Sequence, residues 1–70
     1  MKAKYWTSGV KSVDDFGRRI TDHFYDARTK FGPWAIMNEE TFRQLGVGVG
    51  TGRGQQYAKQ SDGRWLKVEG

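Results

Sequence analysis

Five glycines alternate with other residues along the segment LGVGVGTGRGQ, and a glycine-rich loop is one way in which proteins hold phosphate groups. They are Gly46, Gly48, Gly50, Gly52 and Gly54. The dinucleotide-binding fingerprint and the P-loop both need glycines that lie an odd number of residues apart. All five glycines have even numbers, so neither nucleotide motif is present. Three alternatives stay open for the segment: a mobile connector, close packing over a core aromatic ring such as Trp34, and a loop that binds a polyanion.

His23 is the only histidine and therefore the natural candidate for a general base, with Asp22 and Asp26 near it in the sequence. General-base catalysis needs a partner within hydrogen-bond distance of the imidazole. On a strand, Asp22 and His23 would point to opposite faces, so we expect the two side chains not to meet. No serine or threonine lies in a recognisable nucleophile motif. We expect a solvated or hairpin-paired histidine, no catalytic residue and no enzymatic activity.

A metal site would have to consist mostly of carboxylates, because the chain has one histidine and no cysteine. The neighbouring Asp14 and Asp15 lie in the segment VDDFG, which is typical of a turn. We therefore expect neither a metal ion nor another cofactor.

Aromatic and basic residues are interleaved in the C-terminal part of the chain, a combination that suits single-stranded nucleic acid because bases stack on rings and phosphates pair with cations. The candidate binding residues are Arg53, Lys59, Arg64, Trp65 and Lys67. A two-residue turn at Asp62-Gly63 would place Trp65 and Lys67 on the face opposite Tyr57, whereas a three-residue turn would pair Lys59 with Trp65. Burial of Trp65 in the core is the alternative to a binding role.

The net charge of +4 is unevenly distributed. From Arg43 to Gly70, five basic residues stand against two acidic residues, so this part carries +3 of the total. A basic C-terminal half favours a polyanionic partner, and ordinary solvated surface is the alternative.

Seventy residues favour a single domain, residues 1–70, close to the size at which a hydrophobic core is barely sufficient. Three Trp, three Tyr and four Phe compensate, because each aromatic side chain buries a large apolar area. The N-terminus has no apolar run of the signal-peptide type, and no segment is long and apolar enough to span a membrane. We expect a cytoplasmic protein with no membrane partner.

Short strands and one helix must position these residues. The segments AKYWTS (3–8), RITDHFYDA (19–27) and KFGPWAIM (30–37) are expected to be strands, the first an edge strand and the last two a hairpin. Pro33 belongs at the start of its strand or on an edge, because it has no N–H to donate. The segments QQYAKQ and RWLKVEG, on either side of Asp62-Gly63, form the strongest predicted hairpin.

One short helix is predicted between the two hairpins. Asn38 is a good N-cap, Glu39 and Glu40 place negative charge in the first turn, and Gly46 is positioned to end the helix after Leu45. The order of elements predicts an α+β fold of small antiparallel β-hairpins with one short helix.

The chain from Val13 onward resembles small phage- and prophage-encoded treble-clef or zinc-ribbon-like proteins of largely unassigned function. The resemblance is carried by GRRITDHFYDARTKFGPWAIM, GVGVGTGRGQQY and GRWLKVEG, and from Val13 to the C-terminus it covers about four-fifths of the chain. In that family one Cys-x-x-Cys knuckle precedes a β-hairpin and a second opens the following helix. The matching positions here are Val13, Phe16, Asn38 and Thr41, and none supplies a thiolate. The resemblance implies a scaffold that has lost its metal, with Val13 and Phe16 filling the site as core residues, and it implies no catalytic residues.

These observations together favour a metal-free, non-enzymatic binding module of phage or mobile-element origin. The expected partner is nucleic acid or a nucleoprotein assembly, contacted through Arg53, Lys59, Arg64, Trp65 and Lys67. The alternative is an inhibitor of the anti-defence or anti-CRISPR type, which would bind a protein in the host cytoplasm. Phosphate contacts weaken steeply with ionic strength, whereas an apolar protein interface does not, so salt dependence separates the two.

Overall fold

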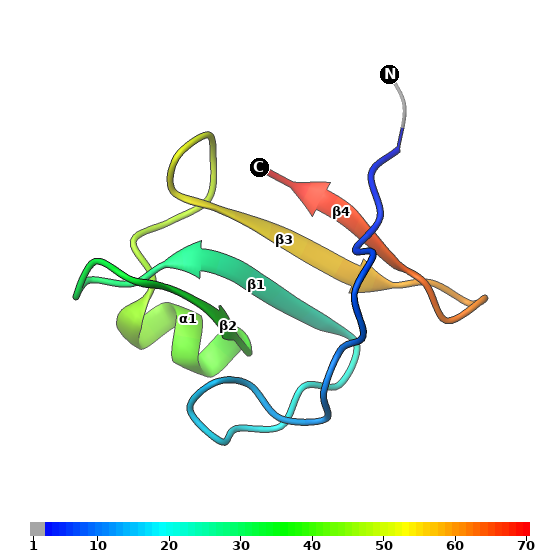
Figure 1. The fold of residues 1–70 in the computed structure, drawn as a ribbon, viewed down its shortest axis with the longest axis horizontal. Coiled ribbons are helices and arrows are strands. Elements are labelled where there is room, and N and C mark those ends of the chain that lie inside the picture. Colours follow the sequence, from blue (N-terminus) through cyan, green and yellow to red (C-terminus); the bar gives the residue numbers. More distant parts are fainter. Residues whose placement is uncertain (1–2) are drawn as a thin grey trace.

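The computed structural model, which describes residues 3–70, contains one antiparallel sheet and one short helix (Figure 1). The elements in chain order are β1 (His23–Arg28), β2 (Trp34–Met37), α1 (Glu39–Leu45), β3 (Gly54–Lys59) and β4 (Trp65–Glu69). The strands lie in the order β2-β1-β3-β4, so each hairpin contributes one central strand and one edge strand. The predicted α+β class is confirmed.

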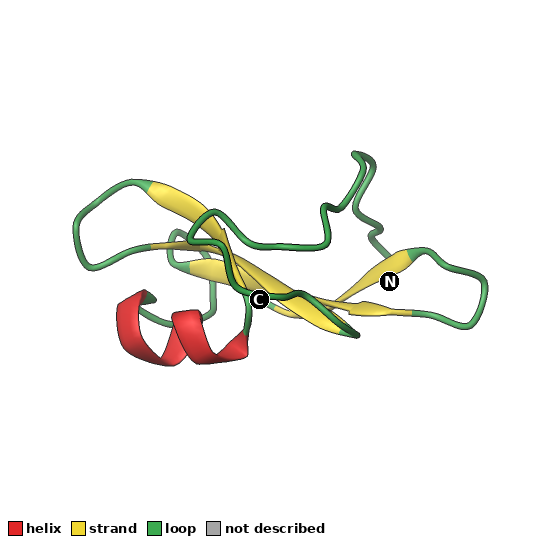
Figure 2. Cartoon of the chain, turned by 90° about the horizontal axis from the view of Figure 1, so that it is seen from below, coloured by secondary structure: helices red, strands yellow, loops and turns green. Residues whose placement is uncertain are grey.

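The two faces of the sheet are covered by different parts of the chain. Figure 2 shows α1 against one face and the irregular N-terminal segment arching over the other, which we call the outer face. On the helix face, the ring of Tyr25 stacks on that of Phe42, with 3.8 Å between centroids. On the outer face, Phe24 is fully buried, and Trp6 packs edge-on against it at 5.3 Å. A seventy-residue chain thus closes both faces mainly with aromatic rings.

The N-terminal segment does not form the regular edge strand predicted for residues 3–8. Tyr5 makes a single bridge to Leu66 of β4, and the N–H of Trp6 donates to the carbonyl of Trp65 at 2.9 Å. Beyond that point the chain leaves the sheet edge, because the indole of Trp6 turns inward over Phe24. The prediction of a regular strand over residues 3–8 was therefore wrong, although part of this segment does lie along the edge of the sheet.

The first predicted hairpin forms, but its first strand is shorter than expected. β1 begins at His23 rather than at residue 19, because the preceding residues pair elsewhere: Val13 bridges to Arg19, and the N–H of Ile20 donates to the carbonyl of Ser12 at 2.8 Å. β2 begins directly after Pro33, as its missing N–H predicted.

The helix begins and ends where the sequence predicted. Asn38 is the N-cap, and its side-chain oxygen accepts from the backbone N–H of Thr41 at 2.8 Å. The N–H of Gly46 donates to the carbonyl of Phe42 and closes the last turn. Gly46 has a φ of −75°, so a left-handed conformation is not the reason for glycine here. A Cβ at this position would instead overlap the ring of Phe42.

The carboxylate of Asp14 joins the N-terminal turn to the start of the helix. Asp14 is 5% exposed, and its two oxygens accept four hydrogen bonds. The donors are the N–H groups of Phe16, Arg18 and Asn38 at 2.9 Å each, and the hydroxyl of Thr41 at 2.7 Å. Burial acts to raise the pKa of Asp14, but these hydrogen bonds outweigh it and hold the pKa below its ordinary value.

Val13 and Phe16 do not fill a core site in this region. They are 43% and 47% exposed, so the expectation drawn from the treble-clef resemblance is wrong for both. The reason is that the space between the turn and the helix is occupied by the Asp14 carboxylate, whose hydrogen bonds need that position.

The β3–β4 hairpin has the three-residue turn, which was the second of the two registers considered. Lys59 pairs with Trp65, and the N–H of Gln60 donates to the carbonyl of Arg64 at 2.7 Å. Gly63 has a φ of +87°, a left-handed conformation that glycine adopts readily.

Replacement of Asp14 by asparagine is expected to lower the free energy of unfolding by about 2–4 kcal/mol, because one amide cannot accept all four hydrogen bonds. Asp15→Asn is the matched control, since exposed Asp15 accepts only one bond, from the N–H of Ile36, and an amide oxygen can keep it. The pKa of Asp14 is lower in the folded protein than in the unfolded chain, so ionised Asp14 adds to the free energy of unfolding. This contribution is complete above the ordinary aspartate pKa, about 4, and is lost as the pH falls through the folded-state pKa. Urea unfolding at several pH values measures this. Equal losses in the two variants would contradict the role given to Asp14.

Gly63→Val is expected to destabilise the protein by roughly 1 kcal/mol or more, because valine is strained at positive φ. The control is Gly9→Val, since a Cβ at Gly9 meets no atom within 4 Å and its φ is not in the strained range. We expect that change to stay within about 0.5 kcal/mol. Thermal or urea unfolding compares the two, and a neutral Gly63→Val would show that the turn does not require glycine.

Candidate functional site

Three of the predicted binding residues lie together on the outer face of the β3–β4 hairpin. Lys59 lies opposite Trp65, and Lys67 lies opposite Tyr57 on the same face. The Nζ of Lys59 is 5.9 Å from the ring centroid of Trp65. Trp65 is half-buried and packs edge-on against Phe24 at 5.2 Å. Its ring therefore belongs to the core on one side and contacts a cation on the other.

Arg64 lies at the turn of this hairpin, with its charge already partnered. Its Nε donates to Asp62 Oδ2 at 2.8 Å, and its backbone N–H donates to Asp62 Oδ1 at 2.9 Å. These hydrogen bonds hold the pKa of Asp62 below its ordinary value. The guanidinium of Arg64 also lies 4.2 Å from the ring centroid of Tyr5, a contact that no sequence pattern indicated. Arg64 is thus the least available cation of the predicted set.

Arg53 does not lie with the other predicted binding residues. It immediately precedes β3, whereas Lys59 and Arg64 lie at the far end of that strand. Six strand residues span about 20 Å, so Arg53 and Lys59 cannot contact the same small group. The five candidate binding residues therefore do not form one compact patch, because position along an extended strand separates residues that are close in sequence.

The structure brings Arg53 to a second group of residues, at the end of the sheet where β1 ends and β3 begins. The N–H of Arg28 donates to the carbonyl of Arg53 at 2.8 Å, and the N–H of Val47 donates to the carbonyl of Arg28 at 3.1 Å. The N–H of Lys30 donates to the carbonyl of Leu45 at 2.7 Å. These bonds tie the β1–β2 turn to the glycine segment. We call five residues at this end of the sheet the loop cluster: Arg28, Lys30, Phe31, Trp34 and Arg53.

The glycine segment is a hydrogen-bonded loop rather than a strand. Gly50 and Gly54 exchange both backbone hydrogen bonds, at 2.8 and 3.0 Å, which closes a tight turn. Close packing does occur, although not over Trp34, which is 46% exposed: a Cβ at Gly54 would overlap that of Ala27. A Cβ at Gly50 would lie 3.0 Å from Nη2 of Arg53, so glycine leaves room for the guanidinium against the loop.

Large apolar side chains are exposed in the loop cluster. Phe31 is 75% exposed and Trp34 is 46% exposed, while Arg28 is the cross-strand partner of Trp34. Phe31 and Arg28 were not among the candidate residues, and Trp34 was expected in the core. The available signal was the segment ARTKFGPW, in which two cations precede two aromatic residues around Gly32-Pro33, a turn sequence that exposes its neighbours.

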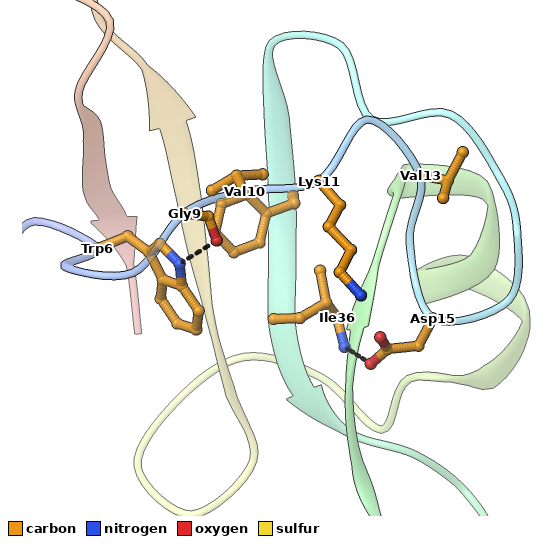
Figure 3. Close-up of a pocket in the computed structure, with 8 residues that line it drawn as sticks. Trp6, Gly9, Val10, Lys11, Val13, Asp15 and Ile36 are labelled. Atoms are coloured by element: carbon orange, nitrogen blue, oxygen red, sulfur yellow. Dashed lines mark hydrogen bonds between the residues drawn. The ribbon is translucent and has the colours of Figure 1, made fainter.

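A small hollow lies elsewhere on the outer face, where the N-terminal segment crosses it (Figure 3). Its volume is about 120 Å³, and its apolar walls include Trp6, Val10 and Ile36, with Lys11 and Asp15 also lining it. Asp15 accepts a hydrogen bond from the N–H of Ile36 at 2.8 Å, which fixes this loop to the edge of β2. Ligand pockets are usually several times larger, so we assign no ligand to the hollow.

His23 is held between two carboxylates, which corrects the expectation that it would not meet Asp22. Nδ1 lies 2.8 Å from Asp22, and Nε2 lies 2.9 Å from Glu39 of α1. Asp22 precedes β1, so strand alternation does not direct its side chain to the opposite face. Partial burial acts to lower the pKa of His23, but the two carboxylates outweigh it and raise the pKa. Both ring nitrogens are engaged, and the contact with Glu39 fastens α1 to the sheet.

Comparison of the chain with known proteins identifies no relative, so the chemistry of its surface is the guide to its function. No protein-family model, curated protein or solved structure matches the chain. Within residues 3–70, no group of three or more His, Asp or Glu side chains has an arrangement that could hold a metal ion. No helix in the same range is long and apolar enough to cross a membrane.

Replacement of the two tryptophans on the edge strands, Trp34 on β2 and Trp65 on β4, should affect stability differently. Trp65→Ala is expected to lower the free energy of unfolding by about 3 kcal/mol, because it removes the half-buried ring that packs on Phe24. Trp34→Ala, at the more exposed position, should cost about 1 kcal/mol or less. Urea unfolding of both variants tests this. Equal stabilities would mean that Trp65 makes no core contact of consequence.

Proposed function

We propose that the protein is a non-enzymatic binding module that acts in the cytoplasm on nucleic acid or a nucleoprotein assembly, through the outer face of its sheet. One observation carries the proposal. The charged strand residues that share this face are three cations, Arg28, Lys59 and Lys67, and one acid, Asp26. Burial, and after it the charge of Asp15, raises the pKa of Asp26.

The spacing of these cations suits an extended polyanion better than a compact ligand. Arg28 ends β1 beside the start of β3, whereas Lys59 ends β3 at the opposite end of the sheet. Lys67 lies on β4, opposite Tyr57. A phosphodiester backbone that crosses the strands could contact cations at both ends, as it does on other proteins that bind nucleic acid through backbone charge.

The alternative, a phage-encoded inhibitor of a host protein, has one specific observation in its favour. Phe31 is 75% exposed, and exposed aromatic residues next to arginine are common in the centres of protein interfaces. Such a partner would have to present acidic side chains to Arg28, Lys30 and Arg53. Its binding would depend less steeply on salt than binding to phosphates.

Binding to a labelled oligonucleotide, measured by fluorescence anisotropy at several salt concentrations, tests the proposal. Arg28→Gln, Lys59→Gln and Lys67→Gln should each weaken binding and lower the slope of log K against log salt by about one unit. The control is Arg43→Gln. Arg43 is exposed on α1, away from the outer face, and pairs with Glu39 at 2.8 Å. Absence of binding at low salt would overturn the proposal, and an equal loss in the Arg43 variant would show that the outer face is not the binding surface.

A further inference from the structure

We infer that the loop cluster is a stacking site for unpaired nucleotide bases, so that the ligand of this protein is single-stranded nucleic acid. The inference rests on the proposed function and goes beyond it, because phosphate contacts alone do not distinguish a single strand from a duplex. Its residues are those of the loop cluster: Arg28, Lys30, Phe31, Trp34 and Arg53.

The aromatic residues of the loop cluster are presented by a turn that the protein holds in one shape. Thr29 is 3% exposed, and both its N–H and its hydroxyl donate to the carbonyl of Pro33, at 2.9 and 2.8 Å. The N–H of Gly32 donates back to the carbonyl of Thr29 at 3.0 Å, and Gly32 has a φ of +106°. Phe31 and Trp34 flank this glycine and its proline. Their rings are therefore exposed on an ordered support, which reduces the entropy that binding must remove.

The charge around these rings selects the kind of partner. Of the segments at this end of the sheet, residues 27–38 and 41–61 contain no Asp or Glu, and the end of β4 contributes one acid, Glu69, opposite Gln56. Within residues 3–70, none of the cations Arg28, Lys30 and Arg53 forms an ion pair, whereas Arg43 and Arg64 do. Exposed rings beside unpaired cations match a ligand that has flat apolar bases and regularly spaced phosphates.

The same geometry favours a single strand over a duplex. In a duplex the faces of the bases are covered by neighbouring base pairs, so an aromatic ring can stack only on a base that is unpaired or splayed out. Within residues 3–70 the only helix is α1, which has seven residues and packs against the sheet through Phe42, so this part of the chain has no long helix to enter a major groove. The exposed rings lie instead at the end of the sheet, within reach of the cations that would hold a backbone.

The test compares an oligothymidylate of about 12 nucleotides with a blunt DNA duplex of equal length, by fluorescence anisotropy at low salt. The variants are Trp34→Leu, Trp34→Phe and Phe31→Leu. Leucine keeps apolar bulk but has no aromatic face, whereas phenylalanine keeps the face. Phe16→Leu is the matched control, because Phe16 is 47% exposed, close to the 46% of Trp34, but lies beside Asp14 and Asp15. Thermal melting of each variant establishes that it is folded.

We expect the oligothymidylate to bind more tightly than the duplex. Trp34→Leu and Phe31→Leu should each weaken its binding about 5- to 150-fold, the range for loss of one stacked base, while Trp34→Phe and Phe16→Leu change it less than about threefold. Equal binding of strand and duplex, or unchanged binding in the leucine variants, would overturn the stacking site and leave the phosphate contacts of the proposed function in place. Absence of binding to both probes would overturn the proposed function itself and favour a protein partner.

Discussion

The rest of the structure depends on the buried carboxylate of Asp14. Four hydrogen bonds connect this one side chain to its own turn and to the first residues of the helix. The chain has no cysteine, so neither a disulfide nor a thiolate-bound metal can make that connection. Fixing the turn also fixes the path of the N-terminal segment, which places Trp6 over Phe24. A buried charge is stable at this position because four donors form hydrogen bonds to the carboxylate.

This arrangement determines which part of the sheet is left open. The helix closes one face through Phe42 on Tyr25 and through Glu39 on His23, and the N-terminal segment closes part of the other through Trp6. Figures 1 and 2 show that α1 lies against one face near the turn between β1 and β2, whereas the N-terminal segment does not reach this end on the outer face. Exposed aromatic rings and unpaired cations are found at that end, so the open surface and the candidate binding chemistry coincide.

The sequence predicted the features that depend on neighbouring residues. Asn38 and Gly46 correctly predicted the two ends of the helix, and Pro33 predicted the start of β2. These signals are local, because a helix cap and the missing N–H of a proline act on the residues next to them. The sequence could not predict which distant loops would meet. Arg53 was grouped with the hairpin residues as a candidate contact, yet its carbonyl pairs with Arg28. Asp14 was interpreted as a turn residue, and two of its four partners do lie in that turn, but the other two lie more than twenty residues away. Such contacts depend on the packing of the whole sheet rather than on local pattern.

The most direct measurement is an NMR titration of the ¹⁵N-labelled protein with oligothymidylate, because its three tryptophans give three separate indole signals. If the open end of the sheet binds unpaired bases, the indole N–H of Trp34 and the amides of residues 28–34 and 46–53 should shift most. The indole signal of Trp6, which packs on Phe24, should move little, and that of Trp65, beside Lys59, should move less than that of Trp34. Shifts centred on the Asp14 turn or on α1, or no shifts at all, would contradict the account.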